Sequence, residues 1–274
     1  MSELIVDTDK FARLRGARRI WAVGPIHGES DRLRDLHSKI SSRFEPGDRL
    51  VYLGNVLGRG PDVAGAVDEV LAFRRAVMAA DGMFAADVAI LRGAQEEMWQ
   101  KLLQLQLALN PAEVFDWMIS QGVGPTLEAY GGSVADGRAA ARSGAAMCAR
   151  WTAGLRDRVH ARSGHTELMS ALRRAAVSVG TDGVARLLFV SAGIDPSRPL
   201  EAQKDSFWWP PGELETLEGP YGNFARVVGG FDRVARGIVE TPFTVTLDGG
   251  AGRGGSLHAV CVDAAGAIGE TLEA

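Results

Sequence analysis

The first hundred residues alternate short apolar runs, glycine-containing loops and amphipathic segments, and this order constrains the fold more than any other feature. The apolar runs lie at residues 19–23, 50–53 and 88–91, and each is followed by a loop that contains glycine. After the first loop, Leu33, Leu36 and Ile40 recur every three to four positions, which is typical of a helix with one buried face. Strand, loop and helix in alternation predict an α/β sheet with functional groups on the loops that follow the strands.

Strand patterns are missing from the middle of the chain. Helices are expected at 102–109, 114–130, 145–162 and 166–176, and a loop is expected at 136–144, where small residues and glycines gather. Strand patterns return at 187–190, 226–228, 244–247 and 257–262. The chain, residues 1–274, is therefore predicted to form a single α/β domain with a helical insertion or cap at about 97–180.

Composition excludes some kinds of binding partner and some cellular locations. The formal net charge of −4 argues against general nucleic-acid binding. Cys148 and Cys261 lie far apart and match no zinc spacing, which indicates thiols in a reducing compartment. No apolar run approaches the roughly 20 residues that a membrane-spanning helix needs. We expect a cytoplasmic protein without a membrane span.

The loop sequences, taken in order, carry a resemblance to a known family. GPIHG follows the first strand, PGDRLVYLGNVLGRGPD surrounds the second and LRGAQEEM surrounds the third, and LLFVSAGIDP, RVVGGFDR and LDGGAGRGGSLHAVCV come later. In this order and spacing they resemble the calcineurin-like metallophosphatases (metallophosphoesterases), especially the bacterial serine/threonine phosphatase-like and diadenosine-tetraphosphatase-like branch. The resemblance covers the chain from about Arg19 onward. It implies an α/β fold with two mixed β-sheets sandwiched between helices (αββα).

The same resemblance implies where a two-metal phosphatase centre would lie, and most of its residues are replaced. Family members hold two divalent metals with six residues: an Asp and a His from the first loop, a bridging Asp from the second, an Asn from the third and two later histidines. A further His is the proton donor, and arginine binds the phosphate. The matching positions here are Pro25, His27, Asn55, Gly58, Arg59, Ala94, Gln95, Ser191 and Phe231. Only His27 survives among the six ligand positions, and Gln95 replaces the proton donor. Phe231 would direct an apolar ring to the position of a ligand imidazole.

Because Mg²⁺ and Mn²⁺ prefer anionic oxygen ligands, a site without a carboxylate is not expected to hold them. The prediction is a pseudophosphatase of hydrolase lineage, with no catalytic residues, no metal and no cofactor.

The favoured function is that of a regulatory or scaffolding protein that binds a protein partner. Between Gly137 and Arg174 there are eight arginines and two acidic residues, so this segment is basic in an acidic chain. The predicted partner surface comprises Arg150, Arg156, Arg158, Trp208 and Trp209. A solvated helix face is the alternative interpretation of the arginines.

Two other functions remain open. Arg59 could bind a phosphorylated small molecule or nucleotide in a metal-free sensor, or it could pair with Asp62. A residual hydrolase would require a rewired metal site, for example His27 with Asp232. His165, in a Gly-His-Thr sequence that is similar to a late metal motif, is interpreted as a helix-start residue beside a Ser163 or Thr166 cap.

Overall fold

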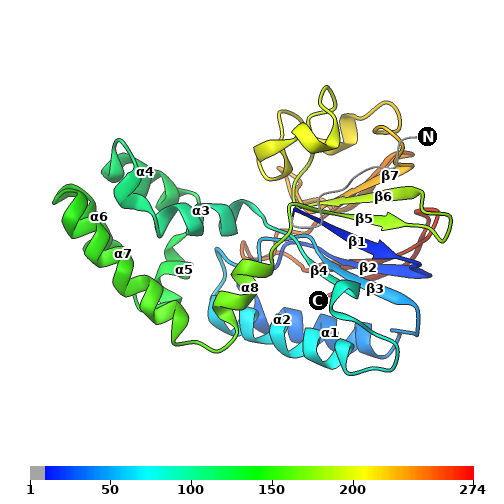
Figure 1. The fold of residues 1–274 in the computed structure, drawn as a ribbon, viewed down its shortest axis with the longest axis horizontal. Coiled ribbons are helices and arrows are strands. Elements are labelled where there is room, and N and C mark those ends of the chain that lie inside the picture. The colour runs from blue at the N-terminus through cyan, green and yellow to red at the C-terminus, as the bar shows by residue number, and fades with distance from the viewer. Residues whose placement is uncertain (1–9) are drawn as a thin grey trace.

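The computed structural model describes residues 10–274, in which two β-sheets pack face to face (Figure 1). One sheet has six strands in the order β1-β5-β6-β7-β9-β8, and the other has five in the order β11-β10-β2-β3-β4. The strands are β1 (Phe11–Arg15), β2 (Arg19–Val23), β3 (Asp48–Tyr52), β4 (Val88–Ile90), β5 (Ala175–Val179), β6 (Ala185–Val190), β7 (Arg226–Gly229), β8 (Gly237–Glu240), β9 (Thr244–Asp248), β10 (His258–Asp263) and β11 (Ile268–Glu273). The predicted α/β fold with two mixed sheets is confirmed.

Strand direction gathers the loops at one end of the sandwich. In the five-stranded sheet β2, β3 and β4 run parallel, and in the six-stranded sheet β6, β7 and β9 run parallel. The carboxyl ends of parallel neighbours meet at the same edge of a sheet. The loops that follow β2, β3 and β4 therefore leave the same edge, as do those that follow β6, β7 and β9.

Three apolar layers hold the sandwich together. The layer between the sheets is built from side chains such as Ile20, Val51, Phe189 and Val260, all of them fully buried. Helices α1 (Ser30–Ser41) and α2 (Val63–Met78) cover the outer face of the five-stranded sheet. The outer face of the six-stranded sheet is covered by short 3₁₀ turns: η3 (Leu200–Ala202), η4 (Lys204–Phe207) and η5 (Leu214–Thr216).

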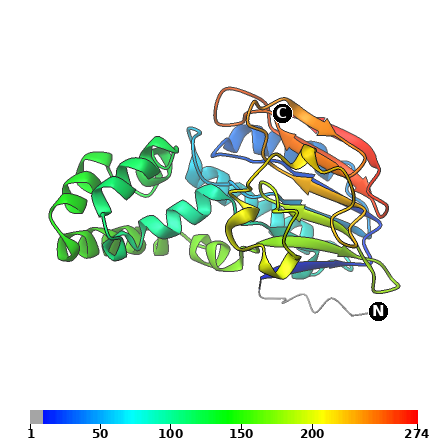
Figure 2. The ribbon, with the colours of Figure 1, turned by 90° about the horizontal axis from the view of Figure 1, so that it is seen from above.

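A group of helices between β4 and β5 extends away from the sheets (Figures 1 and 2). It comprises α3 (Ala94–Leu102), η2 (Leu105–Leu107), α4 (Pro111–Ser120), α5 (Gly124–Ala129), α6 (Val134–Arg142), α7 (Ala145–His160) and α8 (His165–Ala171). We call residues 94–171 the helical arm. Its buried side chains, such as Phe115 and Leu155, belong to the same apolar cluster as those beneath α1 and α2.

The loop expected at 136–144 is wrong, because most of it is helix α6. Ser133 caps this helix by accepting the N–H of Asp136 at 3.1 Å. The small residues allow close packing: a Cβ added at Gly137 would stand 2.5 Å from Phe115 Cζ. A residue pattern that resembled a loop therefore marks a tight helix contact.

The helix expected at 166–176 is also too long, since α8 ends at Ala171 and β5 begins at Ala175. Strands β1, β5, β8 and β11 have no counterpart in the sequence prediction. All four pair with a neighbour along most of their length, so tertiary pairing stabilises segments whose own pattern is weak.

His165 is structural, as expected, but its environment differs from the prediction. It is fully buried, its Nδ1 lies 2.8 Å from the Tyr130 hydroxyl, and its Nε2 lies 3.0 Å from Asp68 Oδ1. It therefore connects α8 to α5 and α2. The N-cap residue is Gly164, and neither Ser163 nor Thr166 caps the helix.

The 3₁₀ turn η1 (Ala85–Asp87) lies between α2 and β4 and directly precedes β4.

Over residues 10–274, none of the helices combines the length and the apolar character that crossing a membrane requires.

Candidate functional site

Backbone hydrogen bonds bring the loops after β2 and β3 into contact. The carbonyl of Asn55 accepts the N–H of Ile26 at 3.1 Å and that of His27 at 2.6 Å. On the other sheet, the carbonyl of Ser191 accepts the N–H of Gly230 at 2.9 Å, which joins the loops after β6 and β7. The sheets thus present two pairs of bonded loops at the position that the resemblance implies for a metal centre.

Two residues at predicted ligand positions have an unusual backbone. His27 has a φ of 52° and Asn55 a φ of 51°, both in the left-handed region that non-glycine residues rarely adopt. Such conformations cost about 1 kcal/mol or more and persist where surrounding contacts fix them. Asn and His tolerate this region better than most non-glycine residues, and the bond from the His27 N–H to the Asn55 carbonyl holds the two loops together here.

The Asn55 side chain bonds to the backbone at the start of α3, and the Gln95 side chain bonds to the end of α4. Asn55 Oδ1 accepts the backbone N–H of Gln95 at 3.0 Å, and Gln95 Nε2 donates to the Gln121 carbonyl at 2.9 Å. A Cβ added at Gly58 would stand 2.8 Å from His27 Nδ1 and 2.9 Å from Gln95 Cγ. His27, Asn55, Gly58 and Gln95 therefore lie together, as the resemblance implies.

Glu96 supplies a buried carboxylate that bonds to the loops after β3 and β4. It is 1% exposed, and its two oxygens accept the N–H groups of Asn55 (2.9 Å), Leu57 (2.9 Å) and Gly93 (2.8 Å). Burial raises the pKa of the Glu96 carboxyl, while these backbone N–H groups lower it. The carboxylate is thus committed to holding the loops after β3 and β4 together. The sequence interpretation missed this role, although an acid three residues after Gly93 is the pattern of a capping box.

Three buried polar atoms near these loops have no hydrogen-bond partner among the described residues: His27 Nδ1, Gln95 Oε1 and Ser191 Oγ. A Cβ added at Gly54 would stand 3.0 Å from Ser191 Oγ, so this hydroxyl faces the second loop. The pKa of His27 is lowered to about 3, first by burial and then by the positive charges of Arg59 and Arg253. At neutral pH the imidazole is therefore uncharged.

These residues do not fit a two-metal centre. Two adjacent divalent ions need bridging and flanking carboxylates, and the nearby Glu96 carboxylate already accepts three N–H groups. Asn55, at the bridging position, is uncharged and its oxygen is engaged by Gln95. Within residues 10–274, no group of three or more His, Cys, Asp or Glu side chains is placed to hold a metal ion.

The remaining pocket positions differ in accessibility. Pro25 and Ser191 are buried, and Ala94 is partly exposed. Phe231 is 42% exposed, so its ring is accessible to solvent, in contrast to the buried Pro25 and Ser191.

Arg59 lies beside a cavity of about 610 Å³. No ion pair or hydrogen bond joins Arg59 to another described residue, and its pKa is lowered, mainly by burial and then by Arg253. The alternative pairing with Asp62 is not found, because the Asp62 carboxylate accepts the Gly65 N–H at 2.9 Å and the Ser30 hydroxyl at 2.8 Å. The cavity lining also includes Glu29, Glu128 and Arg162.

The predicted partner surface is only partly exposed. Trp208 is 4% exposed and packs under the 3₁₀ turns, so its assignment to that surface is wrong. Trp209 is 37% exposed, and its ring lies 6.4 Å from that of Trp117 on α4. Contact between Trp209 and the helical arm was not visible in the sequence, since about ninety residues separate the two rings.

The three arginines of that surface lie on α7 and are exposed. Arg156 Nη1 donates to the Leu103 carbonyl at 2.5 Å, and Arg158 Nη1 donates to the Gly131 carbonyl at 2.8 Å. Both therefore stabilise turns within the helical arm, whereas no such bond is recorded for Arg150.

No protein-family model and no curated protein matches this sequence. Solved structures do match. A protein assigned as a diadenosine tetraphosphatase is 20% identical with a TM-score of 0.57, and the alignment covers 96% of this chain and 97% of that one. A serine/threonine phosphatase from Saccharomyces cerevisiae with similarity to human phosphatase PP5 is 12% identical with a TM-score of 0.50, covering 96% of this chain and 82% of the other. Two mixed sheets, loops gathered at one end and these matches along nearly the whole chain show that the chain has the calcineurin-like metallophosphatase fold.

Proposed function

We propose that this protein is a pseudophosphatase: a cytoplasmic regulatory or scaffolding protein that uses the phosphatase fold for binding and not for hydrolysis. The observation that carries the proposal is the hydrogen bond from the Gln95 N–H to Asn55 Oδ1. It ties the residue at the bridging-ligand position to the residue at the proton-donor position. We also propose that residues 1–274 form one domain, with the helical arm as an insertion.

The alternative of a rewired metal site finds no support at Asp232. Its carboxylate accepts the N–H groups of Val234 (3.1 Å) and Arg236 (3.0 Å), and the Arg236 Nε–H at 2.7 Å. A carboxylate that bonds to three donors is not free to bind a metal ion together with His27.

The test combines metal content with turnover. We expect purified protein incubated with Mn²⁺ to retain far less than one metal per chain, and to hydrolyse phosphomonoesters and phosphodiesters no faster than buffer. Elemental analysis and a chromogenic assay measure both. The control is His27→Ala: turnover that persists in this variant comes from a contaminant. Stoichiometric metal together with turnover that disappears in His27→Ala would refute the proposal.

A second candidate, binding of a phosphorylated small molecule, is supported by Arg59. Arginine binds phosphate with paired N–H donors, and the neighbouring positive charge of Arg253 favours an anion there. The cavity of about 610 Å³ is within the size range of small-molecule sites.

We expect inorganic phosphate or AMP to raise the melting temperature of the wild-type protein, and Arg59→Gln to remove most of this shift. The loss of one charge-assisted contact corresponds to roughly tenfold weaker binding. Thermal unfolding against ligand concentration measures it. Arg156→Gln, on the helical arm, serves as the control with an unchanged shift. An equal shift in Arg59→Gln and wild-type protein would rule out this cavity.

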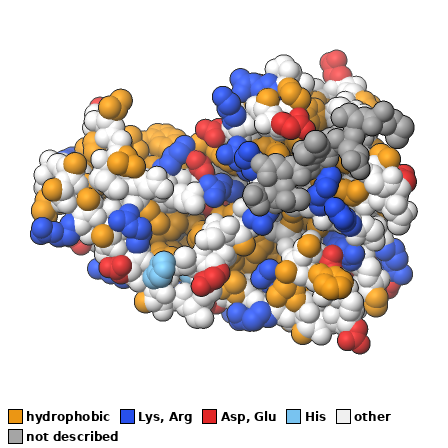
Figure 3. Space-filling model, viewed as in Figure 1, with side chains coloured by type: hydrophobic (Ala, Val, Ile, Leu, Met, Phe, Trp, Pro, Cys, Tyr) orange, Lys and Arg blue, Asp and Glu red, His pale blue; other side chains and the backbone are white. Residues whose placement is uncertain are grey.

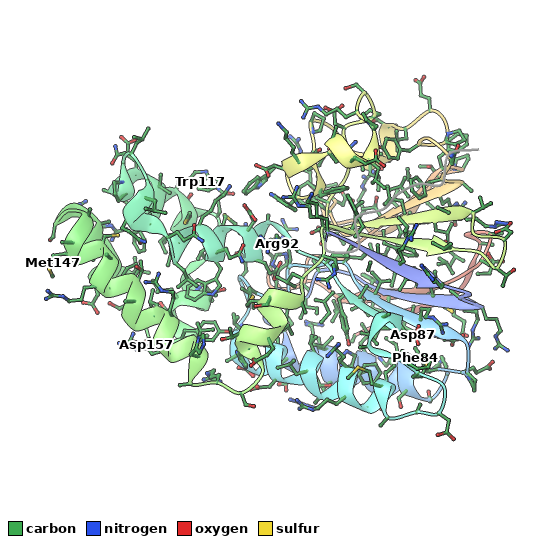
Figure 4. All side chains as sticks on the ribbon, viewed as in Figure 1. Phe84, Asp87, Arg92, Trp117, Met147 and Asp157 are labelled. Carbon is green, nitrogen blue, oxygen red and sulfur yellow. The ribbon has the colours of Figure 1, made fainter. Side chains whose placement is uncertain are left out.

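The helical arm supports the protein-partner proposal. Its exposed apolar side chains are Leu107, Leu109, Trp117 and Met147, of which Leu107 is 75% and Met147 45% exposed. Figure 4 places Met147 at the far end of the arm, away from the sheets. Exposed apolar residues beside arginines such as Arg150 are typical of surfaces that bind proteins.

A further inference from the structure

A second cavity, of about 670 Å³, lies along the side of the sandwich where β1 and β4 form the edges of the two sheets. Five arginines and one acidic residue contribute to its lining. They are Arg13, Arg15, Arg49, Arg74 and Arg173, with Asp87. We call this site the arginine cavity. Its lining is basic although the whole chain carries a formal net charge of −4. In Figure 3 basic side chains recur around the part of the body through which β1 runs.

Among the described residues that line the arginine cavity, the single acid is already engaged. Asp87 Oδ1 lies 2.8 Å from Arg49 Nε, and Asp87 Oδ2 accepts the backbone N–H of Phe84 at 2.8 Å. Arg49 also donates to the carbonyls of Asp48 (2.9 Å) and Arg15 (3.0 Å). Arg49 is therefore neutralised and held in place by Asp87.

Two of the remaining arginines have no partner. Within residues 10–274, Arg15 and Arg74 form no recorded ion pair or hydrogen bond through their guanidinium groups. Arg173 donates to the carbonyl of Ala171 at 3.0 Å, which satisfies a donor but does not balance its charge. Like charges around one cavity repel, and an anion bound between them removes this repulsion. The planar, forked guanidinium group matches phosphate oxygens in particular.

An aromatic ring lies beside these charges. Phe84 is 70% exposed and lines the arginine cavity, together with the small side chains of Ala85 and Ala86. Figure 4 shows Phe84 and Asp87 close together below β3 and β4. Asp87 fixes the backbone of Phe84, so the ring projects from a defined turn. An exposed ring on a fixed backbone offers a surface on which a planar base can stack.

We propose that the arginine cavity binds a nucleoside diphosphate or triphosphate, with the phosphate groups on Arg15 and Arg74 and the base against Phe84. A single phosphate offers one anionic group, whereas a diphosphate or triphosphate offers a separate phosphate group to each of Arg15 and Arg74. The volume is sufficient for a ligand of this size. No residue is shared with the lining of the cavity beside Arg59, so this site is independent of the proposed function.

The test is calorimetric titration of the full chain with ADP, with ATP and with inorganic pyrophosphate. We expect the double variant Arg15→Gln/Arg74→Gln to bind all three at least tenfold more weakly. Phe84→Ala should weaken ADP and ATP binding several-fold and leave pyrophosphate binding unchanged. Within residues 10–274 Arg15 and Arg74 form no side-chain ion pair or hydrogen bond, and Phe84 is 70% exposed, so the variants should unfold close to the wild-type temperature.

Arg59→Gln separates the two sites. Binding that is unchanged in Arg59→Gln and lost in the double variant supports the arginine cavity. Absence of binding to the wild-type chain at millimolar nucleotide, or binding that the double variant retains, would overturn the proposal. Binding that only Arg59→Gln removes would also overturn it, and would instead support the site beside Arg59.

Discussion

Replacement of Glu96 by alanine is expected to lower the free energy of unfolding by about 3–5 kcal/mol, since three buried N–H groups lose a charged acceptor. These donors belong to Asn55, Leu57 and Gly93, so both loops after β3 and β4 lose their shared anchor. A hydrogen bond to a charged group contributes roughly 1.5–3 kcal/mol, and contributions from one network do not add in full. Urea unfolding followed by tryptophan fluorescence measures the change.

Two further variants make this result specific. Glu96→Gln keeps one oxygen and directs an NH₂ group toward backbone donors, so an intermediate loss is expected. Glu113→Ala, at an exposed position on α4, should stay within about 0.5 kcal/mol of the wild-type protein. If Glu96→Ala unfolds within 1 kcal/mol of wild type, the carboxylate does not hold the loops as described.

Acidification from pH 7 to pH 4 is expected to cost the fold about 3 kcal/mol through His37 alone, because its pKa of about 4 lies below the ordinary value of 6.5. The first cause is burial, which lowers the pKa, and the bond to Glu69 raises it in part. The folded state therefore binds fewer protons than the unfolded chain in this range. The stabilisation is fully present above pH 6.5 and is lost as the pH falls toward 4.

The geometry around His37 agrees with an uncharged ring. Nδ1 lies 2.7 Å from Glu69 Oε1, Nε2 lies 2.9 Å from the Tyr52 hydroxyl, and the ring stacks on Phe73 with centroids 3.9 Å apart. Arg34 Nε lies 3.7 Å from the other oxygen of Glu69, so that carboxylate has a second cation beside it. A neutral ring that donates from Nδ1 and accepts at Nε2 satisfies both neighbours.

His37→Gln isolates this contribution. The variant should lose stability more gradually with acid than wild type, by up to about 3 kcal/mol over the same pH range. His160→Gln, at an exposed position, should follow the wild-type curve. Denaturant unfolding at a series of pH values measures all three proteins. Parallel curves for wild type and His37→Gln would contradict the expectation.

The sequence predicted the parts of the fold that repeat a strong local pattern. Buried strands such as β2 and β3 and amphipathic helices such as α1 were found, since their apolar periodicity is visible without tertiary context. Strands such as β1 and β11 were missed because only their neighbours make them strands. Helix α6 was missed because its small residues, which suggested a loop, instead fit against aromatic rings.

For the candidate site, the order of the motifs in the sequence predicted which loops carry the residues, but it could not predict which side chains are buried and which are exposed. Trp208 is 4% exposed and its neighbour Trp209 is 37% exposed. This difference depends on which of the two side chains the 3₁₀ turns cover. Phe231 is likewise 42% exposed while its neighbour Asp232 is 3% exposed, a difference that the sequence alone does not show. The arginine cavity was invisible because its residues come from distant parts of the chain, from Arg13 to Arg173.

The left-handed backbone of His27 and Asn55 has a consequence for redesign. The hardest part of building a catalytic centre into a protein is a backbone that presents side chains from several loops toward one point. On the proposed pseudophosphatase function, the loops after β2 and β3 keep this backbone while Pro25 and Asn55 stand where the family resemblance implies metal ligands. An engineer who wished to place a metal at these loops would therefore begin with substitutions alone, leaving loop lengths and turns as they stand. Glu96 would be left untouched, because it holds two of those loops in place.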